Sequence, residues 1–555
     1  MDRAYDFDFI VIGSGFGGSV AAHRLTEKGY QVGVVEMGKR YRAEDFPETN
    51  WDSKKYFWGP MLGNHGFFRM TLFRHIWVLS GVGVGGGSLV YANTLLVPPE
   101  KVWNDPRWRH LMDWKAVMPA FYETARKMLG VTTNPYMGTA DKLLQAAAKE
   151  QGHGDTFYPT QVGVYFGKSG ETAPDPYFGG EGPERTGCIF CGGCMVGCRY
   201  NAKNTLDKNY LYFAEKHGAQ VIPETLVVDV RPIDGEVDGG RGYEVHTVGS
   251  TDRSREGKVF RARGVVFAGG VLGTVKLLLE THERGSLPNL SRQVGSYVRT
   301  NSESIVAVRT RDKNLDMSDG IAIGSGFYLD EHTHIEAVRY PKGSDALALT
   351  STLMTHGTPG LGRILAWLAL MLRHPLKSLR AVSPGGWARS TLILLVMQTL
   401  DTHIRLRLTR SILPPFRKKL QTETGGKGIP TYIPAANRFA ETMARQLDGM
   451  PTTALTEILL NVPTTAHILG GAAMGADSQE GVIDAFSRVF NYRHMYVCDG
   501  SMIGANLGVN PSLSITALSE HAMSHVKPAR ETDWSDTGQV TRPASPASDP
   551  PPGTS

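Results

Sequence analysis

Residues 7 to 36 constrain the fold most, because they read as a strand, a glycine turn, a helix and a second strand. The apolar "FDFIVIG" runs into "SGFGG", and the helical "SVAAHRLTEKG" and the apolar "YQVGVVE" follow. Gly13, Gly15 and Gly18 form G-x-G-x-x-G between strand and helix. Such glycines permit the turn and let a pyrophosphate approach the helix N-terminus. Glu36 ends the second strand, where a carboxylate can accept hydrogen bonds from ribose hydroxyls. The segment therefore predicts a dinucleotide-binding unit.

The rest of the chain predicts an α/β protein with more than one domain. A chain of 555 residues exceeds the size at which a single core stops growing. Strand-like runs between 221 and 268 are followed by a predicted helix over 271–284. Alternating runs between 330 and 410, such as "HIRLRLT", are typical of an antiparallel sheet with one wet face.

The two ends of the chain and its apolar runs predict where the protein resides and which part of it is disordered. The first strand begins within a few residues of Met1, which leaves no room for a secretory signal, so we expect a cytoplasmic protein. No apolar run reaches the roughly 18 residues that a membrane span needs. The proline-rich, polar segment 528–555 predicts a disordered tail.

Positive charge is concentrated in one segment. The net charge is +5, but residues 363–419 alone hold eleven Lys and Arg against a single acid, Asp401. Within it, "RILAWLALMLRHPLKSLR" allows two interpretations: a peripheral membrane contact through 361–380, or a buried lid helix followed by an exposed basic sheet face. We expect no nucleic-acid binding, because leucines rather than aromatic residues interleave these charges and no recognition module is present.

Four sequence stretches together identify a family resemblance. The stretches are "GSGFGGS", "GVGVGGGSLVYAN", "AHILGGAAMG" and "YVCDGSMIGANLGVNPSLSITAL". In combination they resemble the glucose-methanol-choline (GMC) family of FAD-dependent oxidoreductases, and within it the cholesterol-oxidase branch. The resemblance implies a Rossmann-like FAD-binding domain interleaved with an α+β substrate-binding domain built on a mixed or antiparallel sheet. The expected FAD-binding parts are 1–100, 200–310 and 463–527. The expected substrate-binding parts are 101–199, with the cysteine-rich loop 186–199, and 311–462.

The resemblance also implies cofactor contacts that spacing alone does not reveal. By that likeness, FAD would contact Gly87, Ser88, Asn93, the backbone near Val228, Asp499 and Gly500. The flavin ring would lie between the two domains.

Three further side chains are candidates for catalysis. Alcohol oxidation needs a group that accepts or orients the hydroxyl proton. By the resemblance, His467 and Asn510 flank the flavin and the substrate hydroxyl; the alternative for His467 is a buried histidine with a structural hydrogen bond. In "HTHIEAVRY", the resemblance implies that Glu336 is a base for double-bond isomerisation, and an ordinary solvated or salt-bridged glutamate is the alternative.

Four of the five cysteines lie close together. Cys188, Cys191, Cys194 and Cys198 form C-x2-C-x2-C-x3-C, the spacing with which ferredoxins hold a 4Fe-4S cluster. Arg199 follows where ferredoxins have proline, and no other cysteine group is present. The alternatives are zinc, which usually takes two separated pairs, and a reduced, metal-free turn.

Together these features predict an FAD-dependent alcohol oxidoreductase that oxidises the 3β-hydroxyl of a sterol, with isomerisation of a double bond as an optional second step. The predicted acceptor is oxygen or an electron-transfer partner. Two alternatives stay open. One is an acceptor-linked dehydrogenase of another lipid or terpenoid alcohol that uses an iron–sulfur cluster. The other is a flavin-binding redox partner without catalysis.

Overall fold

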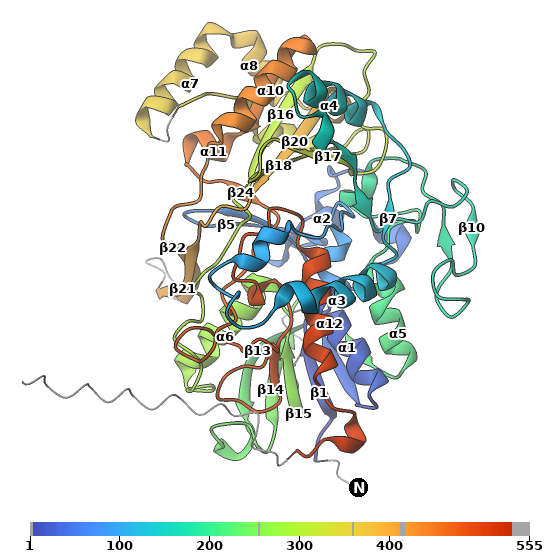
Figure 1. The fold of residues 1–555 in the computed structure, drawn as a ribbon, viewed down its shortest axis with the longest axis vertical. Helices are drawn as coiled ribbons and strands as arrows, with labels where there is room; N and C mark the ends of the chain where they lie inside the picture. Colours follow the sequence, from blue (N-terminus) through green and yellow to red (C-terminus); the bar gives the residue numbers. More distant parts are fainter. Residues whose placement is uncertain (1–3, 253–255, 358–359, 411–417, 535–555) are drawn as a thin grey trace, which may run out of the picture.

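A computed structural model describes residues 4–252, 256–357, 360–410 and 418–534. Its first layer is a seven-stranded sheet in the lower half of Figure 1. Along the sheet the strands are β12 (Gln220–Ile222), β2 (Val32–Val35), β1 (Phe7–Ile12), β15 (Val259–Phe267), β14 (Tyr243–Gly249) and β13 (Thr225–Pro232), and β25 (Met495–Val497) pairs with β15. The strands β12, β2, β1, β15 and β25 run parallel, whereas β14 pairs antiparallel with both β15 and β13.

The predicted βαβ unit is present as β1, α1 (Phe16–Glu27) and β2. Gly13 adopts a φ of +106° in the turn, a left-handed conformation that strains other residues. A Cβ atom on Gly17 would lie 1.8 Å from the carbonyl oxygen of Cys498, so α1 packs directly on the backbone after β25. Helix α12 (Ser512–Ser524) packs against α1 and against α3 (Trp114–Met128).

The second layer is a seven-stranded, antiparallel sheet in the upper half of Figure 1. Its order is β19 (Ser351–Leu353), β23 (Gly449–Ala454), β16 (Ser304–Thr310), β20 (Thr391–Gln398), β18 (Thr333–Val338), β17 (Ile323–Tyr328) and β8 (Tyr158–Pro159). One face packs in an apolar cluster with α4 (Thr139–Glu150) and α10 (Pro434–Gln446). The other face is turned toward the cavity described below.

Alternation along the strands separates the two faces of the second sheet. On the cavity face, Ile305, Leu395 and Glu336 are register partners across β16, β20 and β18. Their sequence neighbours Val306, Leu394 and Ile335 belong to the cluster under α4 and α10. Both faces of this sheet are covered, so its central strands are buried throughout and lack a wet face. The predicted alternation is present in β21 (Ile404–Arg410), which pairs antiparallel with β22 (Lys418–Thr424): Ile404 and Leu406 are buried, whereas Arg407 is exposed.

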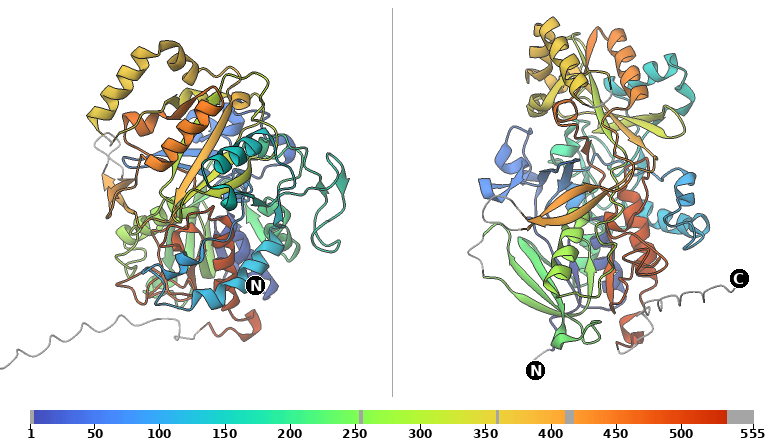
Figure 2. Two further views of the ribbon diagram at one scale, coloured as in Figure 1. Left: turned by 45° about the horizontal axis from the view of Figure 1, so that its top comes forward. Right: turned by 90° about the vertical axis from the view of Figure 1, so that its left-hand side faces the viewer.

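Short elements join the two layers. Strands β5 (Phe68–Leu72), β6 (Trp77–Gly81) and β24 (Thr464–Thr465) form a small sheet. Two helices, α7 (Leu361–Arg373) and α8 (Pro375–Val382), lie at the outer end of the second layer, far from the first sheet (Figure 2). Within the described parts of the chain, no helix combines the length and apolar character needed to cross a membrane.

The fold class is as predicted, but three expected boundaries differ. Strand β16 (Ser304–Thr310) was expected in the FAD-binding part and is central to the second sheet. Helix α3 was expected in the substrate-binding part and packs into the core of the first layer, because its buried face is apolar. Residues 528–534 of the expected disordered tail are ordered: Trp534 packs on Phe9. The rest of that tail lies outside the described residues.

Candidate active site

A cavity of about 1070 Å³ lies between the two layers. Its walls come from the glycine turn after β1, the start of α6 (Gly270–Arg284), strands β5 and β6, and the inner face of the second sheet. Of the predicted site residues, the cavity lining contains Gly13, Gly15, Glu36, Gly87, Val228, His467, Asp499, Gly500 and Asn510. The fold therefore brings together residues that are up to about five hundred positions apart in the sequence.

The glycine turn leaves room for a dinucleotide at one end of the cavity. A Cβ atom on Gly15, which precedes α1, would meet nothing within 4 Å, so the space in front of the helix N-terminus is open. Gly86 of the second glycine-rich stretch packs close to Gly15: a Cβ atom there would lie 2.6 Å from the Gly15 Cα. Open space before uncapped helix amides suits a pyrophosphate.

Glu36 is held by the turn that it borders. Its Oε2 atom accepts a hydrogen bond from the Ser14 hydroxyl at 2.7 Å, and its Oε1 atom accepts one from the Gly38 amide at 2.8 Å. Burial raises the pKa of Glu36, although these hydrogen bonds act in the opposite direction. The carboxyl group lines the cavity, as a ribose-binding group must.

Three predicted cofactor residues lie behind the cavity wall. The missing side chain of Gly18 allows α1 to approach the turn, because a Cβ atom would lie 2.1 Å from the Gly13 carbonyl oxygen. The Ser88 hydroxyl donates to the Gly85 carbonyl at 2.7 Å and braces the second glycine turn. Asn93 is fully buried with a φ of +70°. These three residues support the cavity rather than line it.

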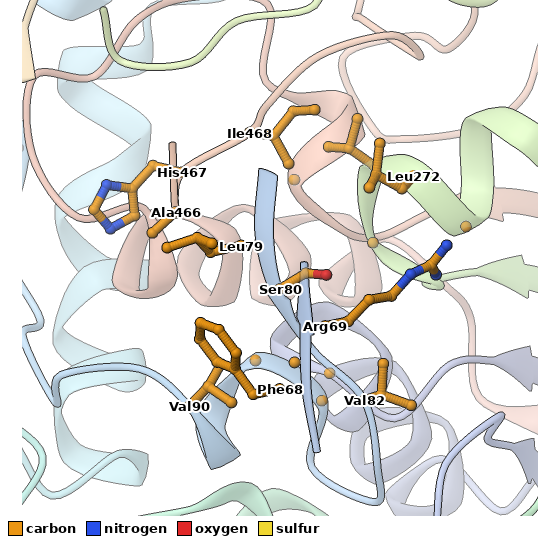
Figure 3. Close-up of a pocket in the computed structure, with 18 of the residues that line it drawn as sticks. Phe68, Arg69, Leu79, Ser80, Val82, Val90, Leu272, Ala466, His467 and Ile468 are labelled. Carbon is orange, nitrogen blue, oxygen red and sulfur yellow. The ribbon is translucent and has the colours of Figure 1, made fainter. Parts of the chain in front are cut away.

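The other part of the cavity is apolar. Its inner-sheet wall contributes Ile305, Ala307, Ile323, Val338, Ile393 and Leu395. Figure 3 shows Phe68, Leu79 and Val90 on the same side of the cavity as His467. An apolar chamber with a few polar groups at one end suits a bulky apolar molecule that carries one polar group.

His467, Asn510 and Glu336 meet at the polar end of this chamber. His467 follows β24, Asn510 precedes α12 and Glu336 lies on β18. The Asn510 Nδ2 atom donates to Glu336 Oε2 at 3.1 Å and lies 3.5 Å from His467 Nε2. The Glu336 Oε1 and Asn510 Oδ1 atoms are buried without a hydrogen-bond partner among the described residues. Buried polar atoms without partners are costly. Asn510 lines the cavity, so its Oδ1 atom is available to a bound ligand, whereas Glu336 lies behind the lining.

Protonation in this group is shifted by burial and by neighbouring charges. Burial raises the pKa of Glu336 to about 7, against the opposing effects of the Asn510 hydrogen bond and of His467. For His467, burial favours the neutral ring, but the carboxyl group of Glu303 outweighs it and raises the pKa above the usual value. Burial therefore brings Glu336 into the pH range in which proton transfer is useful, and Glu303 favours a proton on the His467 ring.

Glu303 is a residue of this site that the sequence did not reveal. It lies just before β16 and is buried. Its Oε1 atom contacts His467 Nδ1, and its Oε2 atom accepts a hydrogen bond from the Ala466 amide at 2.8 Å. No motif surrounds Glu303 in the sequence, and only the packing of β16 against the segment after β24 brings it to the histidine.

The cysteine loop borders the cavity. Cys188, Cys194 and Cys198 pack in one apolar cluster, whereas Cys191 is exposed. Burial raises the pKa of Cys188 and Cys194. Across the described residues, no three His, Cys, Asp or Glu side chains are grouped to hold a metal ion. The thiols thus do not surround a single-ion site, and the iron–sulfur cluster stays a prediction.

Comparison with known proteins gives consistent results at the levels of domain and whole chain. A family model described as GMC oxidoreductase matches residues 417–519, and one described as NAD(P)-binding Rossmann-like domain matches 11–50. A cholesterol oxidase of Acinetobacter baumannii is 53% identical, with 95% of each chain covered. A cholesterol oxidase of Mycobacterium tuberculosis is 47% identical, over 95% of this chain and 92% of the relative.

A solved structure gives the same architecture. Pyridoxine 4-oxidase from Mesorbium loti superposes with a TM-score of 0.62 at 13% identity, over 93% of this chain and 98% of the other. At that identity the likeness concerns the fold alone. The two cholesterol oxidases, in contrast, match along nearly the whole length of the chain and therefore show its family. The chain belongs to the GMC oxidoreductase family, together with the cholesterol oxidases to which it is similar.

Proposed function

We propose that this protein is an FAD-dependent alcohol oxidoreductase that oxidises the 3β-hydroxyl group of a sterol. One observation carries the proposal: a single cavity joins the open glycine cradle to an apolar chamber that ends at His467 and Asn510, and Glu336 is hydrogen-bonded to Asn510 directly behind this end. The cradle suits a dinucleotide, the chamber suits a bulky apolar molecule, and the polar end suits one hydroxyl group.

The residues of the cradle fit FAD. Gly13, Gly15 and Gly87 would lie against its phosphates and flavin, Glu36 would accept from its ribose, and Asp499 lies farther along the same wall. When bound, FAD supplies the acceptor for the hydride that leaves the carbinol carbon. The protein must hold the alcohol and remove its proton.

His467 and Asn510 provide those two actions. With Nδ1–H directed at Glu303, the Nε2 atom of a neutral His467 is free to accept the hydroxyl proton. Oxidation of a secondary alcohol releases one hydride and one proton, and Nε2 takes the proton while the carbon becomes a ketone. The unpartnered Asn510 Oδ1 atom can accept a hydrogen bond from the substrate hydroxyl and so orient it.

Glu336 suits a second, redox-neutral step. In a 5-ene-3-ketone, the base removes a proton from the carbon between the ketone and the double bond, and returns it to the far end of that double bond. The carboxyl group needs a pKa near neutrality to take the proton and give it back. Burial gives Glu336 that property, with a pKa of about 7.

The acceptor of the electrons is proposed to be oxygen, as the resemblance to cholesterol oxidases suggests. The alternative is an acceptor that takes electrons through an iron–sulfur cluster in the cysteine loop. This loop lies close to the cofactor end of the cavity, because Met195 within it lines the cavity and Lys203 joins it to the second glycine turn. A 4Fe-4S cluster held by Cys188, Cys191, Cys194 and Cys198 would lie beside the flavin end and would favour an acceptor-linked dehydrogenase.

One experiment tests the substrate and the acceptor together. The protein is purified without air, assayed for iron and sulfide, and mixed with a 3β-hydroxysterol and separately with its 3α epimer. We expect a flavin spectrum that the 3β sterol bleaches and that air restores, with the epimer inert. In His467→Gln, bleaching should slow by about 10²- to 10⁴-fold with FAD still bound, because the proton acceptor is lost.

Other outcomes of the same experiment would contradict the proposal. A flavin that no alcohol bleaches would indicate a redox partner without catalysis. The control variant for the cysteine loop is Cys498→Ser, which changes the remaining cysteine. If stoichiometric iron and sulfide are present, are lost in Cys191→Ser and are kept in Cys498→Ser, the acceptor is linked to a cluster and is not oxygen. Unchanged bleaching in His467→Gln would reject the role of that histidine.

We further propose that the enzyme is cytoplasmic and contacts membranes through residues 361–380. Helices α7 and α8 expose an apolar ridge made of Leu361, Leu365, Leu368, Leu372, Leu376 and Leu379. The exposed Arg373 and the half-buried Lys377 lie beside it, and the sequence has no Asp or Glu between Asp345 and Asp401. An exposed leucine ridge with basic neighbours and no acids suits an anionic lipid surface.

Helix α8, which carries part of the leucine ridge, packs on elements that line the substrate chamber. Helix α8 packs on β19 and on the turn that precedes it, and Leu347, Thr350 and Ser351 of these two elements line the cavity. A membrane at the ridge would therefore place lipid close to the chamber. Sterols reside in membranes, so this location agrees with the proposed substrate.

A further inference from the structure

Residues 299–303 connect the two layers. This connector contacts both chain segments that carry catalytic groups, which we call the His467 arm and the Asn510 arm. It lies between Val298 and β16, and it faces the segment after β24, which holds His467, and the loop before α12, which holds Asn510. We propose that this connector positions the site, with Glu303 fixing His467 and Asn301 fixing the loop of Asn510. The inference rests on the proposed alcohol oxidation and adds positioning residues to it.

The connector is joined to the His467 arm by backbone and side-chain contacts. Arg299 and Leu469 exchange two backbone hydrogen bonds, at 2.8 and 2.9 Å. The Thr465 hydroxyl donates to the Thr300 carbonyl at 3.2 Å. Glu303 then holds the histidine itself through Nδ1 and the preceding amide of Ala466.

Asn301 joins the connector to the other arm. Its Oδ1 atom accepts hydrogen bonds from the Leu507 amide at 2.9 Å and the Gly508 amide at 3.2 Å, and its Nδ2 atom donates to the Val509 carbonyl at 2.8 Å. These are the three residues that precede Asn510. The side chain is fully buried, so few other groups can compete for these hydrogen bonds.

The backbone of the connector is strained. Asn301 and Ser302 have φ values of 56° and 46°, in the left-handed region that residues with a Cβ atom seldom occupy. Two consecutive residues adopt this conformation only where contacts with the surrounding structure stabilise it. Backbone strain of this kind is common at functional sites. In this connector the strain turns Asn301 toward one catalytic arm and Glu303 toward the other.

Glu303 acts on His467 in two separable ways. A hydrogen bond from Nδ1–H to the carboxylate fixes the tautomer in which Nε2 faces Asn510. The negative charge stabilises a proton on the ring. The groups that act electrostatically on His467 are Glu303 and Glu336, and Glu303 acts more strongly. Loss of the charge alone therefore lowers the pKa of His467 and preserves the tautomer.

Three variants separate these effects in the FAD-loaded enzyme. Glu303→Gln keeps an acceptor for Nδ1–H and removes the charge, Glu303→Leu removes both, and Thr71→Val serves as a control at the neighbouring sheet. Histidine ¹⁵N NMR, with the His467 signals assigned from their absence in His467→Gln, reports the tautomer without any substrate. The readout thus remains valid even if sterols are not the substrate.

For Glu303→Gln we expect the Nδ1-protonated tautomer, a lower His467 pKa, and an acid limb of kcat/KM that moves to lower pH. The same shift should occur in a Glu336→Gln background, which removes the other titrating carboxyl group. For Glu303→Leu we expect a mixture of tautomers and a kcat lowered by roughly 10- to 100-fold, the range typical when a group that orients a metal-ligating histidine is removed.

Two results would overturn the proposal. The first is a His467 tautomer and pKa that are identical in the unmodified enzyme, Glu303→Gln and Glu303→Leu. The second is a loss of activity in Glu303→Gln with an unmoved pH profile, which would mean that the glutamate matters only for folding. If the unmodified enzyme does not turn over sterols but the NMR differences between the variants are present, the proposed substrate is wrong and the positioning role of Glu303 still holds.

Discussion

At the scale of single residues, chemical role follows from neighbours rather than from residue type. The chain has 17 histidines, and His467 stands apart because its ring is acted on by two buried carboxyl groups. His334, on the same strand as Glu336, is equally buried, but burial lowers its pKa to about 3 and keeps it neutral. The glutamate behind His467 therefore gives this histidine a proton affinity that burial alone would remove.

Glu336 leads to a prediction on product and pH. In Glu336→Gln, alcohol oxidation should persist, because the new amide oxygen can still accept from Asn510, whereas isomerisation should stop. The product should then be the unconjugated 5-ene-3-ketone, which ultraviolet absorption distinguishes from the conjugated isomer. In the unmodified enzyme, isomerisation should increase as pH rises through about 7, because only the carboxylate removes a proton.

The measurement is isomerisation of added 5-ene-3-ketone, followed separately from flavin reduction across the pH range. Conjugated product from Glu336→Gln at the unmodified rate would remove the carboxyl group from the mechanism. An isomerisation rate that falls as pH rises through about 7 would show that the ionised carboxylate is not the base.

At the scale of elements, strand alternation and helix termini place the groups of the site. Because side chains alternate across a strand, Glu336 shares a sheet face with Val338, and the register aligns it with Leu395 and Ile305. Helix α1 places its N-terminus at the cavity because β1 ends there. The two glycines at this junction have different tasks, since Gly15 borders open space and Gly17 borders the Cys498 backbone.

This difference predicts opposite outcomes for two alanine substitutions. Gly15→Ala adds a methyl group to open space at a φ of −72°, so folding should be unaffected while FAD binding weakens. Gly17→Ala adds one 1.8 Å from a backbone oxygen, so it should destabilise the whole layer. The measurements are thermal unfolding and retained FAD after dialysis. The assignment is wrong if Gly15→Ala lowers the unfolding temperature as much as Gly17→Ala.

At the scale of the whole molecule, the cavity exists only because the two layers face each other. One layer supplies the glycine cradle and the other supplies the apolar wall, and the connector 299–303 crosses between them. Helices α7 and α8, which carry the leucine ridge, lie at the outer end of the second layer, away from the first sheet (Figure 2). This arrangement separates the proposed membrane contact from the nucleotide-binding part.

The leucine ridge yields a prediction for the intact enzyme. The double variant Leu372→Asp/Leu376→Asp changes side chains that are 82% and 81% exposed, so folding should be unaffected. Its flotation with anionic vesicles should fall by ~10-fold or more, because two apolar side chains no longer enter the lipid. The matched control is Val237→Asp/Val259→Asp on the first layer, where both positions are also exposed. Equal flotation of the two double variants would rule out the ridge as the contact.

Local patterns in the chain were enough to predict the βαβ unit, because it depends on glycines and apolar runs at short spacing. The cofactor FAD and the roles of His467 and Asn510 were predicted from the family resemblance of four sequence stretches. The alternating run around Glu336 also indicated a strand. Short-range patterns carry such information, since turns, caps and alternation are set by neighbouring residues.

Only the tertiary packing decides which residues that are distant in the sequence come into contact. Glu303 reaches His467 across 164 positions, and Asn301 reaches the residues before Asn510 across more than two hundred. The boundary at β16 and the docking of α3 likewise depend on which apolar faces cover each other. These contacts form through packing between layers, and no local pattern in the sequence encodes them.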